Sequence, residues 1–443
     1  MISALQTRRV PIGDMGSQCA EGKKIMARNL SLAHSVKGLN RKRSQHNWTI
    51  ILISGILTFL LSLLILLTVV PILSPSAGGD MADMLRTIVG PGPVAVLESV
   101  SFQLQDLFNQ VRYQISGEQS QFAFSDQPQS QVIPTLAPIN SSAGSLQNIP
   151  IPSSTPGIQN TPVSTPNVIT EGPQIGWQAF GPNINGTPAM ARALVMLDPQ
   201  RSYTAVALVR IDLSRLQLHM MPGNIEPAHP SGISQSIPDL GMVPPPEWSQ
   251  LIAAFNGGFK QVHGHYGMMV DGITLLPPED GIATVALYRN GQVKIGAWGT
   301  EINQTPDLVA FRQNCPLLIE AGQINQALYR DNRSVSGTTG NTDITWRTGL
   351  GLTTDGRYLI YAVGNWTDAA TLAESLQKAG AYMAMQLDIH QLYAHFYTYQ
   401  PNTDPNSSAT YPLTSDRLVA EMVYNPHIYL TPNPRDFFYL TSH

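Results

Sequence analysis

Two polar motifs follow apolar strand patterns and could act together in chemistry. Residues 381–388 read AYMAMQLD, a strand pattern that delivers one carboxylate, Asp388, to a loop. Residues 253–259 read AAFNGGF and deliver an amide, Asn256, with Gly257 and Gly258 in the same way. A carboxylate held at a strand end can act in proton transfer. The two motifs therefore predict a shared pocket.

The elements that must position these motifs lie in residues 176–443. Strand patterns recur over 202–211, 216–221, 282–288, 292–296, 348–353 and 358–363. Asn-Gly at 290–291 and Asp-Gly at 355–356 predict hairpin turns. One helix is predicted, capped by Thr367 or Asp368 and ended by Gly380. Many strands and few helices predict an α+β fold, one large domain with a mixed or antiparallel sheet.

The N-terminal part of the chain predicts a membrane anchor. Residues 1–47 hold nine Lys/Arg against two acidic residues, a net of +7, so the remainder carries −11. Residues 49–70 contain no charge, and roughly 20 apolar residues are enough to cross a bilayer. We predict a transmembrane helix over 48–73, with the basic tail in the cytoplasm and the C-terminal domain outside. A buried helix and a cleaved signal peptide are the alternative interpretations.

Two further segments separate this predicted anchor from the domain. Residues 74–117 predict a juxtamembrane amphipathic helix, which either is a spacer or self-associates through 94–113. Residues 118–175 are rich in Gln, Ser, Thr, Pro and Asn, contain no Lys or Arg, and predict a disordered linker. Cys19 and Cys315 fall on opposite sides of the predicted membrane, so no disulfide between them is expected. Beyond the basic tail, no face predicts nucleic-acid binding.

The order of motifs resembles the phosphodiester glycosidase family, which includes the lysosomal uncovering enzyme and bacterial exopolysaccharide-associated proteins. The resembling segments are residues 253–259 (AAFNGGF), 267–272 (GMMVDG), 346–356 (WRTGLGLTTDG), 371–380 (TLAESLQKAG) and 385–388 (MQLD). The resemblance covers about residues 200–440. It implies one cleft at converging strand ends, formed by Asn256, Gly257, Gly258, Asp271, Arg347 and Asp388.

The resemblance also assigns roles within this implied cleft. Arg347 would bind the phosphate of a sugar phosphodiester, because a guanidinium pairs with phosphate oxygens through two parallel hydrogen bonds. Structural readings stay open: the Asn-Gly-Gly segment as a tight turn, Asp271 with Gly272 as a hairpin turn, and Arg347 as an arginine stacked on Trp346. Lys260 either adds positive charge to the pocket or is a solvated loop residue.

Three histidines are further candidates. His263 and His265 either supply an acid or base near neutral pH or form part of a metal pair, but no third ligand is spaced to complete a cation site. No cofactor is therefore predicted. His390 either replaces a polar contact or faces solvent.

The last motif departs from the family pattern. Catalytic members read Asp-Gly-Gly-Gly-Ser, whereas this chain has Asp388 followed by Ile, His and Gln. Two functions therefore remain: a membrane-anchored extracytoplasmic hydrolase of sugar phosphodiesters in envelope or exopolysaccharide glycans, or a non-catalytic glycan-binding module of the same fold.

Overall fold

The computed structural model describes residues 51–58, 62, 75–116, 122–126, 175–229, 232–237, 239–330, 332–335, 339–403, 411–425 and 427–443. The chain divides into two compact units, Met1–Val69 and Val70–His443. In the first unit, residues 51–58 are helical. Among all described residues, no helix combines the length and the apolar character needed to cross a membrane. The predicted span 48–73 lies largely outside the described residues, so it stays a prediction.

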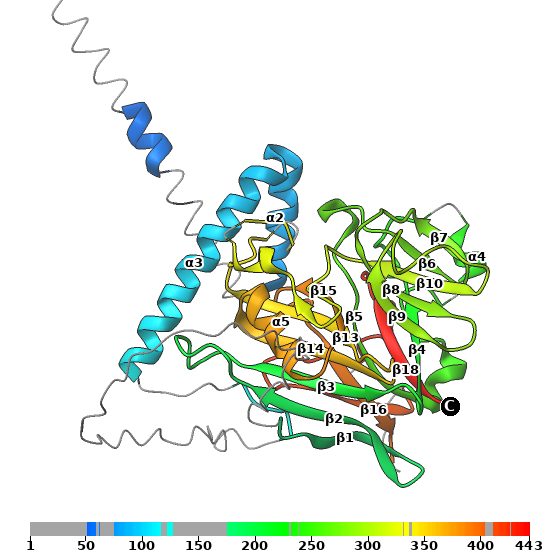
Figure 1. Ribbon diagram of the computed structural model, residues 1–443. Helices are drawn as coiled ribbons and strands as arrows, with labels where there is room; N and C mark the ends of the chain where they lie inside the picture. The colour runs from blue at the N-terminus through cyan, green and yellow to red at the C-terminus, as the bar shows by residue number, and fades with distance from the viewer. Residues whose placement is uncertain are drawn as a thin grey trace, which may run out of the picture. The chain divides into compact units, whose positions relative to one another are not determined.

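Three sheets build the second unit over its described residues (Figure 1). The eight-stranded sheet runs in the order β1 (Gln178–Ile184), β2 (Thr187–Val195), β3 (Val206–Asp212), β14 (Tyr358–Thr367), β13 (Thr345–Leu352), β15 (Met383–Ile389), β11 (Ile319–Glu320) and β12 (Gln323–Ile324). The first five-stranded sheet runs β7 (Ile273–Leu276), β6 (Met268–Val270), β10 (Leu308–Gln313), β8 (Ala283–Tyr288) and β9 (Val293–Ala297). The second runs β17 (Leu413–Arg417), β16 (Phe396–Pro401), β5 (Leu251–Asn256), β18 (Phe437–Ser442) and β4 (Leu216–Met221).

Every pair of these named strands is antiparallel. The expectation of a mixed or antiparallel sheet is thus confirmed in its antiparallel form. Both predicted hairpins are present: Asn290-Gly291 joins β8 to β9, and Asp355-Gly356 joins β13 to β14. Glycine is required at both turns, because Gly291 and Gly356 have positive φ.

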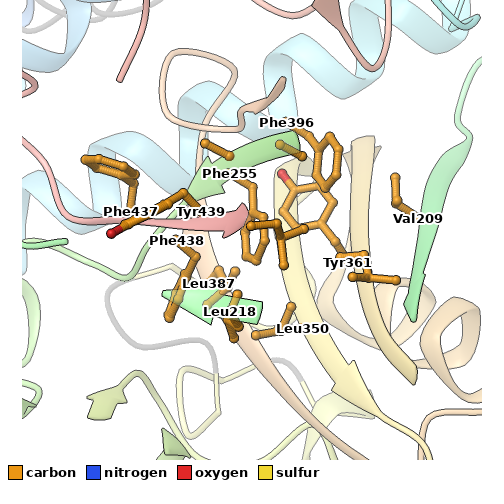
Figure 2. Close-up of a cluster of buried hydrophobic side chains, with 14 of the residues drawn as sticks. Val209, Leu218, Phe255, Leu350, Tyr361, Leu387, Phe396, Phe437, Phe438 and Tyr439 are labelled. Atoms are coloured by element: carbon orange, nitrogen blue, oxygen red, sulfur yellow. The ribbon is translucent and has the colours of Figure 1, made fainter. Parts of the chain in front are cut away.

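Aromatic side chains fill the core between the eight-stranded sheet and the sheet that contains β5 and β18. Figure 2 shows Phe255, Phe396 and Phe438 meeting Tyr361 and Leu350 across this layer. The Phe255 and Phe396 rings stack with their centroids 5.7 Å apart. Strand β4 begins with alternating buried and exposed residues because one of its faces enters this core, whereas β5 is buried along its whole length.

Helix α5 (Ala369–Lys378) covers the other face of the eight-stranded sheet. Asp368 caps it, accepting the Thr371 N–H at 2.7 Å, as one of the two predicted caps. Its apolar stripe packs on β13 and β14, so β13 is buried along its whole length. A Cβ at Gly351 would lie 2.7 Å from the Ala381 Cβ, so glycine there lets the chain leaving α5 lie close to the sheet.

Two helices precede the domain. They are α2 (Pro75–Val89) and α3 (Pro91–Ser116), and α3 contains the predicted amphipathic segment 94–113. Gly90, with φ of 84°, separates them. Only part of α3 packs against the rest of the unit: Val94 and Phe102 are buried, whereas Leu107 and Phe108 are exposed. The remaining helices are short: α4 (Ile233–Ser236), η1 (Pro245–Gln250), η2 (Gln261–His263) and η3 (Gln326–Tyr329).

A short part of the expected linker belongs to the domain. Phe122, Ala123 and Phe124 are buried, and Phe124 forms an isolated bridge with Val419. The Arg192 guanidinium lies over the Phe124 ring at 4.1 Å. The polar composition of residues 118–175 hid this apolar triplet, which anchors the segment because its side chains can be buried. The rest of the predicted linker lies outside the described residues.

Candidate functional site

Asp388 lies at the end of β15, where a β-bulge changes the direction of its side chain. Arg347 on β13 pairs with Ile389, whereas Gly349, two residues later, pairs with Gln386. Strand β15 therefore has one extra residue between these pairs. An extra residue bends the strand and re-aims the side chains beside it. This bulge, which the alternating sequence pattern does not reveal, sets the direction of Asp388.

Hydrogen bonds join the two predicted polar motifs at this bulge. The Asn256 amide nitrogen donates to Thr348 Oγ1 at 2.9 Å, and the Thr348 hydroxyl donates to the Asp388 carbonyl at 2.5 Å. The Asp388 N–H donates to the Gly257 carbonyl at 3.0 Å. The ends of β5 and β15 thus meet, as the sequence predicts.

A buried ion pair fixes the Asp388 carboxylate. Its Oδ2 accepts a hydrogen bond from Arg435 Nη2 at 2.5 Å, and its Oδ1 accepts from the Ile389 N–H at 2.9 Å. Arg435 Nη2 also donates to the Gly258 carbonyl at 2.9 Å. The residue Asp388 is 6% exposed and Arg435 is 9% exposed, so the pair is almost shielded from solvent.

A second buried ion pair lies directly beside the first. Arg312 Nε donates to Asp436 Oδ2 at 2.9 Å, and the Gly258 N–H donates to the same oxygen at 3.0 Å. A Cβ at Gly257 would lie 2.0 Å from Asp436 Oδ2, and one at Gly258 would lie 2.9 Å from Arg312 Cζ. Glycine is therefore required because the ion pair packs directly against this backbone. The two N–H groups donate to Asp436, so they are not free for the predicted phosphate contact.

Burial raises the pKa of Asp388 to about 6, and the Arg435 charge opposes this shift. Charged carboxylates lose hydration when they are buried, which favours the protonated form. A carboxyl group with a pKa near 6 changes protonation state close to neutral pH, as a general acid or base must.

Two cationic side chains border an aromatic ring beside this carboxyl. The Arg435 guanidinium lies 4.6 Å from the centroid of the Tyr393 ring, and Lys260 Nζ lies 5.6 Å from it. Lys260 and Arg435 thus lie beside the same ring, and a contribution of Lys260 to a pocket stays a prediction.

His390 takes a backbone conformation that favours glycine. Its φ is 74°, and its N–H donates to the Trp346 carbonyl at 3.0 Å. The Phe102 ring of α3 lies against the His390 ring, with centroids 5.4 Å apart. Burial lowers the pKa of His390 to about 4, so the imidazole is neutral at pH 7. The Phe102 ring of α3 thus partly covers His390, and its replacement of a polar contact stays a prediction.

Residues 249–388 match the family model described as phosphodiester glycosidase. The chain contains a phosphodiester glycosidase domain. The family match begins just before β5 and ends at Asp388, so it includes both polar motifs that meet at the bulge. No curated protein matches the chain.

Three solved structures are similar to this chain at low identity. The zebrafish N-acetylglucosamine-1-phosphodiester alpha-N-acetylglucosaminidase catalytic domain, auto-inhibited by its pro-peptide, has 14% identity and a TM-score of 0.37, over 61% of this chain and 88% of that chain. A hypothetical protein from Synechocystis has 9% identity and a TM-score of 0.29, over 60% and 64%. An exported protein from Burkholderia pseudomallei K96243 has 10% identity and a TM-score of 0.31, over 55% and 75%. None of these likenesses carries an argument about activity.

Arg347 in the phosphodiester glycosidase domain is part of the scaffold. Its Nε donates to the Thr367 carbonyl at 3.1 Å, and its Nη1 donates to Gln386 Oε1 at 3.0 Å. Its Nη2 donates to the carbonyls of Gly340 and Asp343 at 2.8 and 2.9 Å. The side chain is fully buried. The predicted phosphate contact of Arg347 does not fit this geometry, because backbone carbonyls and Gln386 already use four of its donors.

The surroundings of Asn256 and Asp271 also differ from those expected of substrate contacts. Asn256 is buried, and its Oδ1 accepts the Tyr361 hydroxyl at 2.9 Å and the His395 N–H at 3.1 Å. Asp271 has φ of 50° and forms the β6–β7 turn with Gly272. It is exposed and lines a cavity of about 270 Å³ whose lining includes neither Asp388 nor Arg435. Asn256 thus braces the site, and Asp271 does not belong to it.

His263 and His265 lie on the loop that follows the Asn-Gly-Gly motif. The His263 ring meets the edge of Phe259, with centroids 6.5 Å apart. His265 is exposed and has φ of 53°. Neither stands among three or more metal-ligating side chains, because no such group forms within the described residues. A role as acid or base for either histidine stays a prediction.

The sequence interpretation missed Arg435, Asp436 and Glu226. Arg435 and Asp436 are the charged pair directly before the apolar strand β18, and they carry the only Lys, Arg, Asp or Glu side chains in residues 427–443. Charges beside an apolar strand could have marked them. Glu226 Oε2 accepts the Gln261 N–H at 3.1 Å, and its backbone N–H donates to Pro434 at 2.8 Å. Glu226 thus joins the loop that carries His263 and His265 to the segment that carries Arg435.

Proposed function

We propose that this chain is a hydrolase of sugar phosphodiesters and that Asp388 is its general base. The observation that carries this proposal is the ion pair between Asp388 and Arg435 at the end of a family-matched segment. It places a titratable carboxyl next to a cationic group that suits a phosphate. The elevated pKa of the carboxyl suits proton transfer near neutral pH.

The proposed step breaks the bond between the anomeric carbon and the phosphate oxygen. The oxygen of a water molecule forms a bond to the anomeric carbon while ionised Asp388 accepts a proton from that water. The bonding electrons leave with the phosphate oxygen, and the products are a free sugar and a phosphomonoester. Glycosidic hydrolysis generally uses two carboxyl groups. Glu226 is the second carboxyl that we propose, because it interacts electrostatically with Arg435.

Hydrolysis of an aryl or sugar phosphodiester by the purified full-length chain tests this proposal. We expect turnover by the wild type and loss of turnover in Asp388→Asn. The surface variant Glu320→Gln, which changes an exposed carboxylate in the same way, should keep wild-type turnover. Unchanged turnover in Asp388→Asn would contradict the assignment of the base.

A non-catalytic glycan-binding module is the second candidate function. The observation that favours it is His390, whose ring and the Phe102 ring occupy a place where the catalytic family pattern has glycine. Binding of a sugar phosphodiester without turnover, in both the wild type and Asp388→Asn, would support this function over the first.

We further propose that the predicted segment 48–73 anchors the domain outside the cytoplasm, where envelope or exopolysaccharide glycans are the substrates. Protease treatment of intact cells tests this location, because an extracytoplasmic domain is cleaved while the basic tail is protected. Protection of the domain would contradict the proposed location.

We also propose that α3 mediates self-association. Leu107, Phe108 and Val111 expose 57%, 66% and 46% of their surface, and their apolar side chains could be buried by a second copy. Sedimentation of the wild type and of the double variant Leu107→Lys, Phe108→Lys tests this. A wild-type monomer in solution would exclude the proposed contact.

A further inference from the structure

Three buried arginines surround the end of β15, and they differ in how fully their hydrogen-bond donors are used. A guanidinium has five N–H donors. Arg312 makes five hydrogen bonds, to both oxygens of Asp436 and to the carbonyls of Tyr266, Gln313 and Phe259. Arg347 makes four. Arg312 and Arg347 are therefore satisfied by the fold itself.

Arg435 is different, because among the described residues only its Nη2 has acceptors. These are Asp388 Oδ2 and the Gly258 carbonyl. Its Nε is buried and has no hydrogen-bond partner among the described residues. A buried donor without an acceptor is costly, so native proteins rarely leave one unexplained. Arg435 thus retains unused donors next to the titratable carboxyl.

An unused Nε does not by itself mark a site, as Arg192 shows. Arg192 is also buried, its Nη2 pairs with Asp126, and its Nε likewise has no partner among the described residues. Its guanidinium, however, lies over Phe124 and Phe180, away from any carboxyl implicated in chemistry. Arg435 instead combines unused donors with the Asp388 carboxyl and the Tyr393 ring.

The charges around Arg435 include both signs. The ion pairs Arg435–Asp388 and Arg312–Asp436 are each neutral. Lys260 adds positive charge on the side of Tyr393, and Glu226 adds negative charge to the field at Arg435. A phosphodiester carries one negative charge, and its oxygens accept hydrogen bonds from guanidinium N–H groups. The unused N–H donors of Arg435, rather than a net positive charge, therefore suit this monoanion.

We propose that Arg435 binds the phosphate of the substrate, so that the Asp388 site selects ligands with an anionic phosphodiester over neutral glycosides. The identity of the ligand as a substrate rests on the proposed hydrolysis of sugar phosphodiesters. The binding of a phosphodiester by Arg435 does not depend on it. Arg435 lies 47 residues beyond Asp388 and outside the family-matched segment 249–388. It takes the role that the sequence had assigned to Arg347.

Binding without turnover tests the proposal. Dimethyl phosphate is the probe, titrated into the full-length chain and followed by NMR, with a methyl glycoside as the neutral comparison. We expect Arg435→Gln to weaken dimethyl phosphate binding by roughly tenfold to a hundredfold, because hydrogen bonds to charged groups have that effect on affinity. Arg435→Lys, which keeps the charge, should weaken binding less.

Arg192→Gln is the matched control. It removes another buried, ion-paired guanidinium, and its strand β2 is separated from β15 by three strands of the same sheet. If Arg192→Gln weakens binding as much as Arg435→Gln, a general loss of stability explains the effect and the proposal is wrong. It is also wrong if the wild type does not bind dimethyl phosphate, or if Arg435→Gln binds it as tightly.

The outcomes separate this inference from the proposed hydrolysis. Arg435-dependent phosphate binding without turnover supports the anion site and rejects the hydrolase. Turnover of a charged substrate with an unchanged KM in Arg435→Gln supports the hydrolase and rejects the anion site. Thermal unfolding of each variant shows whether it is folded at the assay temperature. If Arg435→Gln is not folded, phosphate binding by Arg435→Lys is compared with that of the wild type instead.

Discussion

Asp388 Oδ2 lies 2.5 Å from Arg435 Nη2, although the two residues are 47 positions apart in the chain. The contact joins the end of β15 to the residue that precedes Asp436 and β18. It links two of the three sheets at the point where the family-matched segment ends. Proton transfer, anion binding and local stability should therefore all respond to changes at this pair.

Replacing the carboxyl of Asp388 should remove activity more than it removes structure. Asp388→Asn is nearly the same size but cannot accept the proton from water, so we expect turnover to fall by about 10²-fold or more. Steady-state kinetics on a phosphodiester measures this loss. Circular dichroism should show an unchanged fold, and a variant that unfolds would leave Asp388→Glu as the informative comparison.

The pH dependence of turnover should follow the ionisation of Asp388. The general base must be ionised, and burial raises its pKa to about 6, so activity should rise as the pH increases through about 6. Arg435 lowers this pKa, so Arg435→Gln should move the rising limb to higher pH. Initial rates between roughly pH 4.5 and 8 measure the rising limb in the wild type and in Arg435→Gln. A limb that stays in place in the variant would show that another group is titrating.

The raised pKa of Asp388 makes the free energy of unfolding depend on pH. The folded-state pKa of Asp388 is raised above its ordinary value of 3.8, so the folded protein holds the proton more tightly than the unfolded chain. Its contribution to stability is present below about pH 4 and is lost as the pH rises through about 6. Urea unfolding at several pH values should show this decline in the wild type and not in Asp388→Asn. Parallel pH curves for both proteins would contradict the assigned shift.

Arg347 should affect stability rather than phosphate binding. Arg347→Leu removes the guanidinium donors of Gln386 Oε1 and of the Thr367 and Asp343 carbonyls, and each buried acceptor left unpaired costs about 1–3 kcal/mol. We therefore expect the free energy of unfolding to fall by several kcal/mol. Arg357 provides the control, because its side chain is 51% exposed in its ion pair with Asp212, so Arg357→Leu should cost less than Arg347→Leu. A weaker phosphate affinity in folded Arg347→Lys would restore the original assignment.

Helix α3 should control the environment of His390. Asp106 on α3 accepts two hydrogen bonds from Arg201, both at 2.9 Å, and one from the Tyr203 hydroxyl. Asp106→Ala removes this attachment, so Phe102 should separate from His390 and the low pKa of His390 should rise towards its ordinary value of 6.5. An NMR titration of the His390 ring measures the change.

The control for this experiment lies on the same helix. Gln103 is exposed on α3, so Gln103→Ala should leave the pKa of His390 unchanged. If Asp106→Ala also leaves it unchanged, the burial of His390 does not depend on the Asp106 attachment.

The sequence predicted much of the scaffold, because each element carries local signals. The alternation of β4, the Asn290-Gly291 and Asp355-Gly356 turns, and the Asp368 cap of α5 each depend on neighbours within a few residues. These signals survive in any tertiary context. The order of five motifs, rather than these signals, resembles the family whose model matches residues 249–388.

Charged side chains were harder to assign. A buried arginine that satisfies backbone carbonyls and one that pairs with a catalytic carboxyl look the same in a sequence. Arg347 was assigned to the phosphate because its motif is local, and Arg435 was missed because its partner lies in another sheet. Glu226 was missed for the same reason, since only the fold brings it to Gln261 and Pro434.

The sequence by itself determined that Asp388 ends an apolar strand and that Asn256-Gly-Gly ends another, because hydrophobic period and turn chemistry are local properties. Only the tertiary structure decided what the carboxyl faces. The bulge in β15 and the packing of β18 against β5 bring Arg435 to Asp388 and turn Arg347 away. Long-range strand pairing sets these distances, and no spacing within a single segment encodes them.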